Sequence, residues 1–227
     1  MAGTLGEAEF RKLRTPRAAA VAGIVFGVLF ATSIVLLRTS LPAAAGSPWL
    51  RGQTQITIAL VLAPFAGIAF LWFIGVIRDR FGVLEDRFFA TVFLGSGLLL
   101  LAMMCVSMAL AGGLLAVSRQ SKAPEAELMF FGREVMLHIN NVYEVRLAAV
   151  FMISLGTIWL RTGLMPRALA IVTYVLALSL LVVVSFSLWV TLMFPAWVVL
   201  ISAYILTTDR TRRRLSPDAG DVHRRRP

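Results

Sequence analysis

Residues 134–161 read EVMLHINNVYEVRLAAVFMISLGTIWLR, and this stretch decides the fold because it places ionisable residues inside an apolar run. From Asn140 or Asn141 to Arg161 the run is about 20 residues long, which is what a helix needs to cross roughly 30 Å of hydrocarbon. Glu144 and Arg146 are the ionisable residues that this interpretation leaves close to hydrocarbon. We therefore predict a membrane-spanning helix over residues 140–160.

The composition of the whole chain agrees with a membrane location. Of its 227 residues, 59% are hydrophobic and only 15% are charged, and the mean hydropathy is +0.83. Soluble domains average roughly 45–50% apolar and about 25% charged residues, so most of the apolar surface here must face lipid. The single cysteine, Cys105, lies in an apolar run and excludes an intrachain disulfide. We predict an all-α, polytopic transmembrane helix bundle.

Long stretches without charge predict six spans, at about 18–37, 54–77, 88–117, 140–160, 168–188 and 194–208. The first could instead be a signal peptide cut after LPAAAG at 41–46, but a signal peptide's apolar region is usually only about 7–15 residues long. The third run exceeds one crossing, so its helix must tilt, extend past the interface or break near Gly112 and Gly113. The uncharged run 168–208 fits two crossings, with a turn near Trp189 to Pro195.

The two ends of the chain are basic. Residues 1–17 form a basic N-terminal segment, and residues 209–227 hold seven arginines and are expected to be a disordered tail. With six spans and both termini in the cytoplasm, cytoplasmic segments would hold about three times as many Lys and Arg residues as external ones. The tail either binds the anionic inner leaflet or serves only as a topology signal. No nucleic-acid motif is visible, so no nucleic-acid partner is expected.

Small residues at regular spacing predict where spans one and two pack against other helices. Gly23 and Gly27 continue a four-residue spacing that starts at Ala19, and Ala63 and Gly67 do the same in the second span. Small side chains on one face let another backbone approach closely. We expect Gly23, Gly27, Ala63 and Gly67 to be helix-packing residues.

Polar residues gather at the start of the predicted fourth span, and they are the candidate site: His138, Asn140, Asn141, Glu144 and Arg146. At about 1.5 Å per residue, Glu144 and Arg146 would lie roughly 6–9 Å below the external interface. In one interpretation they line an external-facing cavity where Glu144 binds a cation, a proton or a lipid headgroup, and Arg146 engages a phosphate or an acid. In the other, Arg146 extends toward the interface while Glu144 and the asparagines cap and solvate the helix mouth.

A dense charge cluster separates spans two and three and is a candidate cytoplasmic docking loop, made of Arg78, Asp79, Arg80, Glu85, Asp86 and Arg87. The string Gly75-x-x-x-Asp79-Arg80-x-Gly82 resembles the loop motif between the second and third helices of major-facilitator transporters. It departs from that motif at Val83 and Leu84, where basic residues would stand. The alternative is a structural turn whose charges complement the helix dipoles.

Enzymatic chemistry has little support in the sequence. HExxH, GxSxG and CxxC motifs are absent, and only two histidines occur, of which His223 lies in the tail. We expect no catalytic residues, no bound metal and no cofactor.

Four strings carry a resemblance: FLWFIGVIRDR, EDRFFATVFLGSGLLLLA, NNVYEVRLAAVFMISLGTIWLRTGLMPR and FPAWVVLISAYIL. Together they resemble an uncharacterised family of bacterial six-span integral membrane proteins, over most of residues 18–206. The resemblance implies that Tyr143-x-x-Arg146 and Arg161-Thr162-Gly163 recur, and it implies the bacterial inner membrane. In size and composition the chain is also similar to accessory membrane subunits of lipid transporters of the mammalian-cell-entry type.

These observations lead to two functional expectations. The first is a non-enzymatic accessory or scaffolding subunit that contacts another membrane protein or lipids. The alternative is a small transporter, as a dimer, or a lipid-binding protein that uses the polar site on span four.

Overall fold

The computed structural model describes residues 3–40, 53–81, 87–120, 126–163, 165–182 and 188–214. Within them, side chains are described from Arg17 in the first segment and up to Thr208 in the last, apart from short pieces at the ends of inner segments. The described residues are helical except for the link from Gly163 to Pro166. The prediction of an all-α helix bundle is therefore confirmed.

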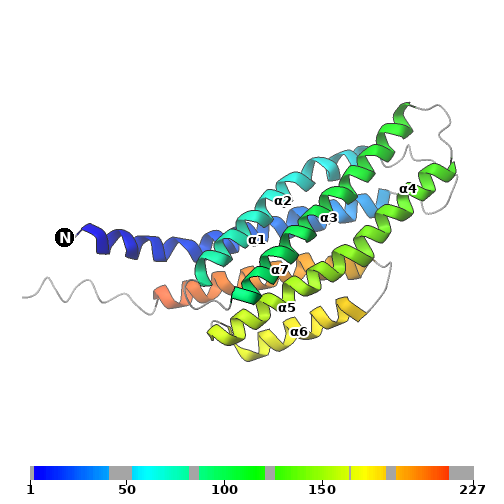
Figure 1. The fold of residues 1–227 in the computed structure, drawn as a ribbon. Helices are drawn as coiled ribbons and strands as arrows, with labels where there is room; N and C mark the ends of the chain where they lie inside the picture. The colour runs from blue at the N-terminus through cyan, green and yellow to red at the C-terminus, as the bar shows by residue number, and fades with distance from the viewer. Residues whose placement is uncertain are drawn as a thin grey trace, which may run out of the picture.

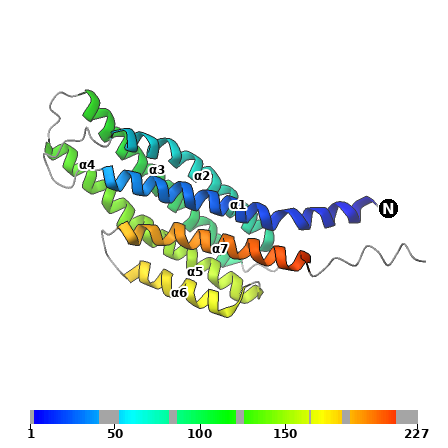
Figure 2. The ribbon, with the colours of Figure 1, turned by 180° about the vertical axis from the view of Figure 1, so that it is seen from behind.

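The helices form one elongated bundle (Figures 1 and 2). In chain order they are α1 (Gly3–Ser40), α2 (Gln53–Phe81), α3 (Arg87–Gln120), α4 (Ala126–His138), the π-helix η3 (Ile139–Glu144), α5 (Val145–Thr162), α6 (Arg167–Val182) and α7 (Leu188–Arg214). The segments α4, η3 and α5 follow one another without a gap as a single helical rod. At one end of the bundle the α3 and α4 ends lie together, and at the other end the start of α1 projects alone (Figure 1).

Five helical segments are long and apolar enough to cross a membrane: Arg17–Ser40, Gln53–Arg78, Phe88–Gln120, Ala126–Thr162 and Val190–Thr208. The remaining helix, α6, has only 16 residues. At about 1.5 Å per residue it spans roughly 24 Å, which is less than the hydrocarbon thickness. The chain therefore has the helices of a multi-pass membrane protein, and its predicted fifth span is shorter than expected.

The structure moves the bounds predicted for the fourth and sixth spans. The helix predicted at 140–160 starts at Ala126, because the apolar residues of α4 allow it to continue beyond the membrane boundary. The turn predicted at Trp189 to Pro195 is instead helical, and α7 runs through Pro195. An interior proline costs one backbone hydrogen bond, which membrane helices tolerate when neighbours pack against the freed group.

The structure also defines three further boundaries. α3 continues unbroken through Gly112 and Gly113 to Gln120, so the long third run extends past one crossing rather than breaking. The basic N-terminal segment is helical from Gly3. The expected disordered tail starts too early, because α7 continues to Arg214, and residues 215–227 lie outside the described part. Basic residues at a helix C-terminus suit the helix dipole, which explains the continuation.

The small residues of spans one and two lie where helices meet. A Cβ atom added at Gly23 would approach Ser202 of α7 and Phe73 of α2, and one added at Gly27 would approach Val199 and the Pro195 carbonyl oxygen of α7. Gly67 lies against Leu101 and Met104 of α3, and Ala63 is buried. Gly23 and Gly27 therefore let α1 pack closely against α7 as well as against α2.

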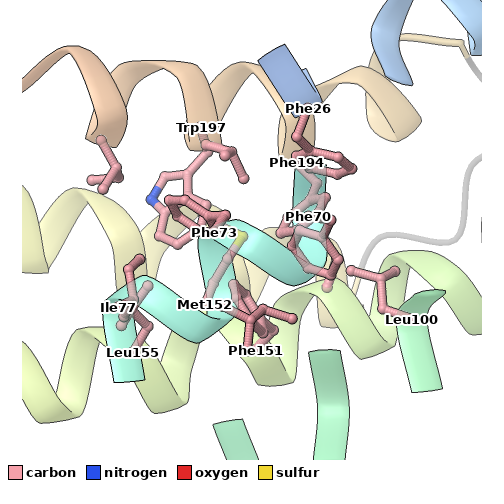
Figure 3. Close-up of a cluster of buried hydrophobic side chains, with 14 of the residues drawn as sticks. Phe26, Phe70, Phe73, Ile77, Leu100, Phe151, Met152, Leu155, Phe194 and Trp197 are labelled. Carbon is pink, nitrogen blue, oxygen red and sulfur yellow. The ribbon is translucent and has the colours of Figure 1, made fainter. Parts of the chain in front are cut away.

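Aromatic side chains fill the middle of the bundle (Figure 3). We call this cluster the aromatic centre, and it consists of Phe26 from α1, Phe70 and Phe73 from α2, Phe93 from α3, Phe151 from α5, and Phe194 and Trp197 from α7. The ring of Phe151 lies 4.6 Å from that of Phe93 and 5.4 Å from that of Phe70, between centroids. Five helices are thus held together by one set of ring contacts.

A second, separate cluster of buried apolar residues lies toward the α3–α4 end. We call it the outer apolar cluster, and it consists of Leu37, Ile56, Ala59, Ala63, Met108, Ala111, Leu115, Met136 and Leu137. Its members come from α1, α2, α3 and α4.

Candidate functional site

Buried polar residues lie between the two apolar clusters. We call them the polar layer, and it consists of Ser107 of α3 and Asn140, Asn141 and Glu144 of η3. The exposed fractions are 0%, 5%, 1% and 7% in that order. Along the helical rod, Met136 and Leu137 of the outer apolar cluster precede this layer, and Phe151 of the aromatic centre follows it. These polar residues are therefore packed inside the protein and do not form the solvated helix mouth that one interpretation of the sequence expected.

The local sequence explains why a π-helix forms here. The Asn141 side-chain amide donates a hydrogen bond to the Leu137 carbonyl oxygen at 2.6 Å. In an α-helix that carbonyl would accept from the backbone N–H of residue 141, so the side chain competes with the backbone. The hydrogen-bond ladder then moves to the wider spacing of η3, which runs from Ile139 to Glu144. Short π-helical segments are rare and occur frequently at functional sites.

Arg38 of α1 completes the site, and it lies one residue beyond the span predicted at 18–37. Its Nη2 donates to Asn141 Oδ1 at 2.6 Å, and its positive charge acts on the Glu144 carboxylate. Helix side chains lean toward the N-terminus of their own helix. Because α1 and the α4–η3–α5 rod run in opposite directions, Arg38 leans into the bundle while Glu144 leans toward Arg38.

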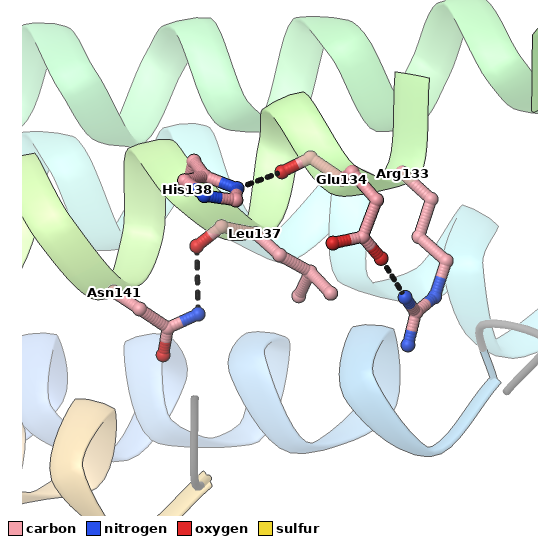
Figure 4. A network of polar contacts seen from close by, with 5 residues as sticks. All are labelled: Arg133, Glu134, Leu137, His138 and Asn141. Atoms are coloured by element: carbon pink, nitrogen blue, oxygen red, sulfur yellow. Dashed lines mark hydrogen bonds and ion pairs between the residues drawn. The ribbon is translucent and has the colours of Figure 1, made fainter. Parts of the chain in front are cut away.

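A partly exposed charged group adjoins the site on α4. Arg133 forms an ion pair with Glu134, and it lies close enough to Arg38 for the two positive charges to repel each other. His138 is exposed, and its Nδ1 contacts the Glu134 carbonyl oxygen at 3.0 Å. Figure 4 shows Arg133 and Asn141 on the side of the rod that faces α1, with His138 turned elsewhere. Of the candidate site, His138 therefore stays outside the polar layer.

Arg146 also stays outside the polar layer. Its Nη1 donates to the Val142 carbonyl oxygen of its own helical rod at 2.8 Å, and the residue is half-buried. This geometry follows from the lean of helix side chains toward the N-terminus. The structure thus brings together Asn140, Asn141 and Glu144, and leaves His138 and Arg146 on the outside.

The face of the rod that meets α3 carries two members of the polar layer. Gly97 of α3 lies against Phe151, and Leu114 of α3 lies against Gly132. This antiparallel register places Ser107 at the level of Ile139 to Asn141. Buried residues recur at three- or four-residue spacing on both helices. On α3 they are Phe93, Gly97, Leu100, Met104, Ser107, Ala111 and Leu114, and on the rod they are Met136, Asn140, Glu144, Ala148 and Phe151.

Buried polar atoms on this face lack hydrogen-bond partners. Within the described residues, neither Asn140 Oδ1 nor Ser107 Oγ has a partner. Most buried polar atoms in proteins are hydrogen-bonded, and an unsatisfied one costs about 1–3 kcal/mol. Two such atoms beside a buried carboxylate point to a ligand or to ordered water.

The candidate docking loop is only partly described. Arg78 is exposed near the end of α2. Asp79 and Arg80 belong to the last turn of α2 and Arg87 starts α3, but their side chains lie outside the described part, as do Glu85 and Asp86 altogether. Near the opposite end of the same loop, Arg161 of α5 lies over the Phe89 ring at 4.7 Å.

Two members of the site carried little signal in the sequence. Arg38 ends an uncharged run, and basic residues in that position usually mark the membrane boundary. The inward direction of its side chain follows only once the helix is known to continue to Ser40, because helix side chains lean toward the N-terminus. Ser107 is one of three serines in the uncharged run from Phe88 to Ser118, and nothing in the sequence distinguishes it from the others. No family model matches this chain, and neither a curated protein nor a solved structure matches it.

Proposed function

We propose that this chain is a non-enzymatic accessory or scaffolding subunit that lies in a bacterial plasma membrane and acts by contact with another membrane protein or with lipids. The observation that supports it best is the aromatic centre, where Phe26, Phe70, Phe93, Phe151 and Phe194 from five helices pack together. Transporters commonly hold their substrates near the bilayer midplane, between helices. Here that region is filled with side chains, which favours a scaffold over a transport path.

Charge supports the proposed orientation and the lipid contact. With both termini in the cytoplasm, the arginines of residues 209–227 lie beside the anionic inner leaflet, where each contributes about 1 kcal/mol of attraction close to the surface. The charged loop at 78–87 then faces the cytoplasm and offers ion pairs to a partner. The polar layer lies toward the external end in this orientation.

One observation favours a second candidate, a small transporter that works as a dimer. Glu144 is buried within a helix long enough to span the membrane, and an ionisable residue in that position is by default a candidate for ligand or ion binding. The polar layer would then be its binding site.

Affinity purification of the full-length chain in mild detergent tests the two candidates. We expect one partner membrane protein to co-purify at a fixed stoichiometry, as measured by quantitative mass spectrometry, with the mass of the complex given by light scattering. A variant with neutralised loop charges, Arg78→Gln with Asp79→Asn, should reduce co-purification, whereas Val175→Ala on the lipid-facing side of α6 should not. A pure homodimer with no partner would refute the accessory role and favour the transporter.

A further inference from the structure

The face between α3 and η3 has the composition of a small cation site. It holds the Asn140 amide oxygen, the Glu144 carboxylate and the Ser107 hydroxyl oxygen, and all three residues are more than nine-tenths buried. Asn140 and Glu144 are four residues apart on one helical rod, so they share a face, and Glu144 leans toward Asn140. Ser107 lies at the same level on the facing helix, as the contacts of Gly97 with Phe151 and of Gly132 with Leu114 require.

These oxygens are suited to a group with hydrogen-bond donors or a positive charge between them. Asn140 Oδ1 and the carboxylate can only accept hydrogen bonds, and Asn140 Oδ1 and Ser107 Oγ have no partner among the described residues. An anion would be repelled by this face. A ligand with donors or a positive charge would satisfy every member of it.

Arg38 does not fill this role for Asn140. Its guanidinium lies on the α1 side of the rod, where it donates to the neighbouring Asn141. Asn140 and Asn141 are consecutive residues of η3 and point in different directions around the helix axis, so the two amides serve different faces. When Glu144 is neutralised by a ligand on the α3 side, Arg38 keeps its hydrogen bond to Asn141.

The charges around the layer limit the ligand to one positive charge. The charged or titratable groups nearby are Arg38 from α1, Arg133, Glu134 and His138 from α4, and Arg146 from α5. No charged residue occurs between Phe88 and Ser118 of α3 or between Val190 and Thr208 of α7. Glu144 supplies a single negative charge, and a divalent ion would leave excess positive charge beside Arg38.

We propose that Ser107, Asn140 and Glu144 form a binding site for a monovalent cation, either Na⁺ or a proton. Sodium takes the carboxylate, amide and hydroxyl oxygens as its ligands. A proton instead resides on the Glu144 carboxyl group, which then donates to Asn140 Oδ1. The inference is independent of the accessory role, because it names what the layer binds and not what the protein contacts.

The test uses the full-length protein, purified in detergent. The first measurement is binding of radioactive ²²Na⁺ at high pH, and the second is the thermal unfolding midpoint as a function of Na⁺ at fixed ionic strength, with choline as the replacement ion. A ligand that binds only the folded state raises the midpoint. Saturable binding with such a rise identifies sodium. No sodium effect, but a midpoint that rises as the pH falls, identifies the proton.

Variants show whether the response comes from this site. Asn140→Leu and Ser107→Ala should weaken sodium binding by about ten- to a hundredfold, because each removes one oxygen ligand. Glu144→Gln should abolish both responses yet remain folded, since its amide can donate to Asn140 Oδ1 as the protonated carboxyl does. Tyr143→Phe, an exposed residue of the same π-helix, is the matched control and should behave as the unaltered protein. Responses absent from the unaltered protein, or unchanged in all three site variants, overturn the proposal.

Discussion

The aromatic centre and the polar layer both include residues of the α4–η3–α5 rod, Phe151 in the centre and Asn140 and Glu144 in the layer, yet their buried polar atoms differ. In the centre, the indole N–H of Trp197 donates to Thr173 Oγ1 at 3.0 Å. In the layer, Glu144 lies seven residues before Phe151 and is buried near Asn140, whose amide oxygen has no partner among the described residues. The indole N–H of the centre is paired, although the Ser202 hydroxyl near Phe73 has no partner among the described residues, whereas in the layer an amide oxygen and a hydroxyl without partners lie on the face that also holds a carboxyl group.

The difference shows where stability and function separate in this bundle. Helix association in a membrane depends on packing and on interhelical hydrogen bonds, because lipid is as apolar as a leucine side chain. The centre supplies both. The layer has ionisable and amide groups that cost free energy unless they are paired, so their presence in the interior favours a binding role.

The largest expected effect is the loss of a ring from the centre. Phe151→Ala removes a fully buried side chain that contacts the rings of Phe70, Phe93 and Phe194, and should lower the free energy of unfolding by about 3–5 kcal/mol. Denaturation in SDS, followed by circular dichroism, measures it. Val175→Ala on the exposed side of α6 is the control and should change stability by less than about 0.5 kcal/mol. Equal effects of the two substitutions would mean that the centre is not the main packing unit.

The next effect concerns Arg38 and its neighbours in the polar layer, Asn141 and Glu144. Arg38→Met removes the hydrogen bond to Asn141 Oδ1 and the positive charge near the buried Glu144, and should cost about 1–3 kcal/mol of stability. The double variant with Glu144→Gln should recover at least about half of that loss, because the uncompensated charge is gone. Arg146→Met, which removes a hydrogen bond to the rod's own backbone, should cost less than about 1 kcal/mol. No recovery in the double variant would show that Arg38 acts through packing alone.

Hydropathy and charge predicted much of this fold because the bilayer imposes a simple rule on sequence. Charge-free runs such as 54–77 and 88–117 had to become helices, and the helices α2 and α3 contain them. Helix ends were less accurate, because the residues around Ala126 and Pro195 are compatible with both a turn and a continuing helix. The aromatic residues and the proline at 189–195 predict a turn, but α7 continues through Pro195, which there lies close to Gly27 of α1.

The candidate site was predicted only in part, for a geometric reason. Asn140, Asn141 and Glu144 stood out because polar residues are unusual in a span. Arg38 and Ser107 reach the same layer from helices far away in sequence, and no periodicity in the chain specifies which helices become neighbours. The direction in which a long side chain leans, inward for Arg38 and along its own helix for Arg146, depends on helix direction and cannot be seen in composition.

A third prediction compares two glycines of opposite surroundings. Gly27→Ala should destabilise the protein by about 1–3 kcal/mol, because the new Cβ atom would meet Val199 and approach the Pro195 carbonyl oxygen at 2.9 Å. A Cβ atom added at Gly113 would have nothing within 4 Å. Gly113→Ala should therefore stabilise the protein by about 0.5–1 kcal/mol, because alanine has the better helix propensity. The same SDS titration measures both. If the two substitutions changed stability in the same direction, the close contact of α1 with α7 would be disproved.

The smallest expected effect tests the hydrogen bond from Trp197 to Thr173, and with it the comparison between the aromatic centre and the polar layer. Thr173→Val keeps the side-chain shape but removes the acceptor for the Trp197 indole N–H, which is buried among aromatic rings. Stability should fall by about 1–2 kcal/mol, and the tryptophan fluorescence should shift as the indole loses its hydrogen bond. Ser154→Ala is the control, because its hydroxyl bonds only the Val150 carbonyl of its own helix, and it should cost less than about 0.5 kcal/mol. If Thr173→Val were as harmless as Ser154→Ala, the centre would tolerate an unsatisfied donor, and the unpartnered oxygens of the polar layer would no longer distinguish it as a binding site.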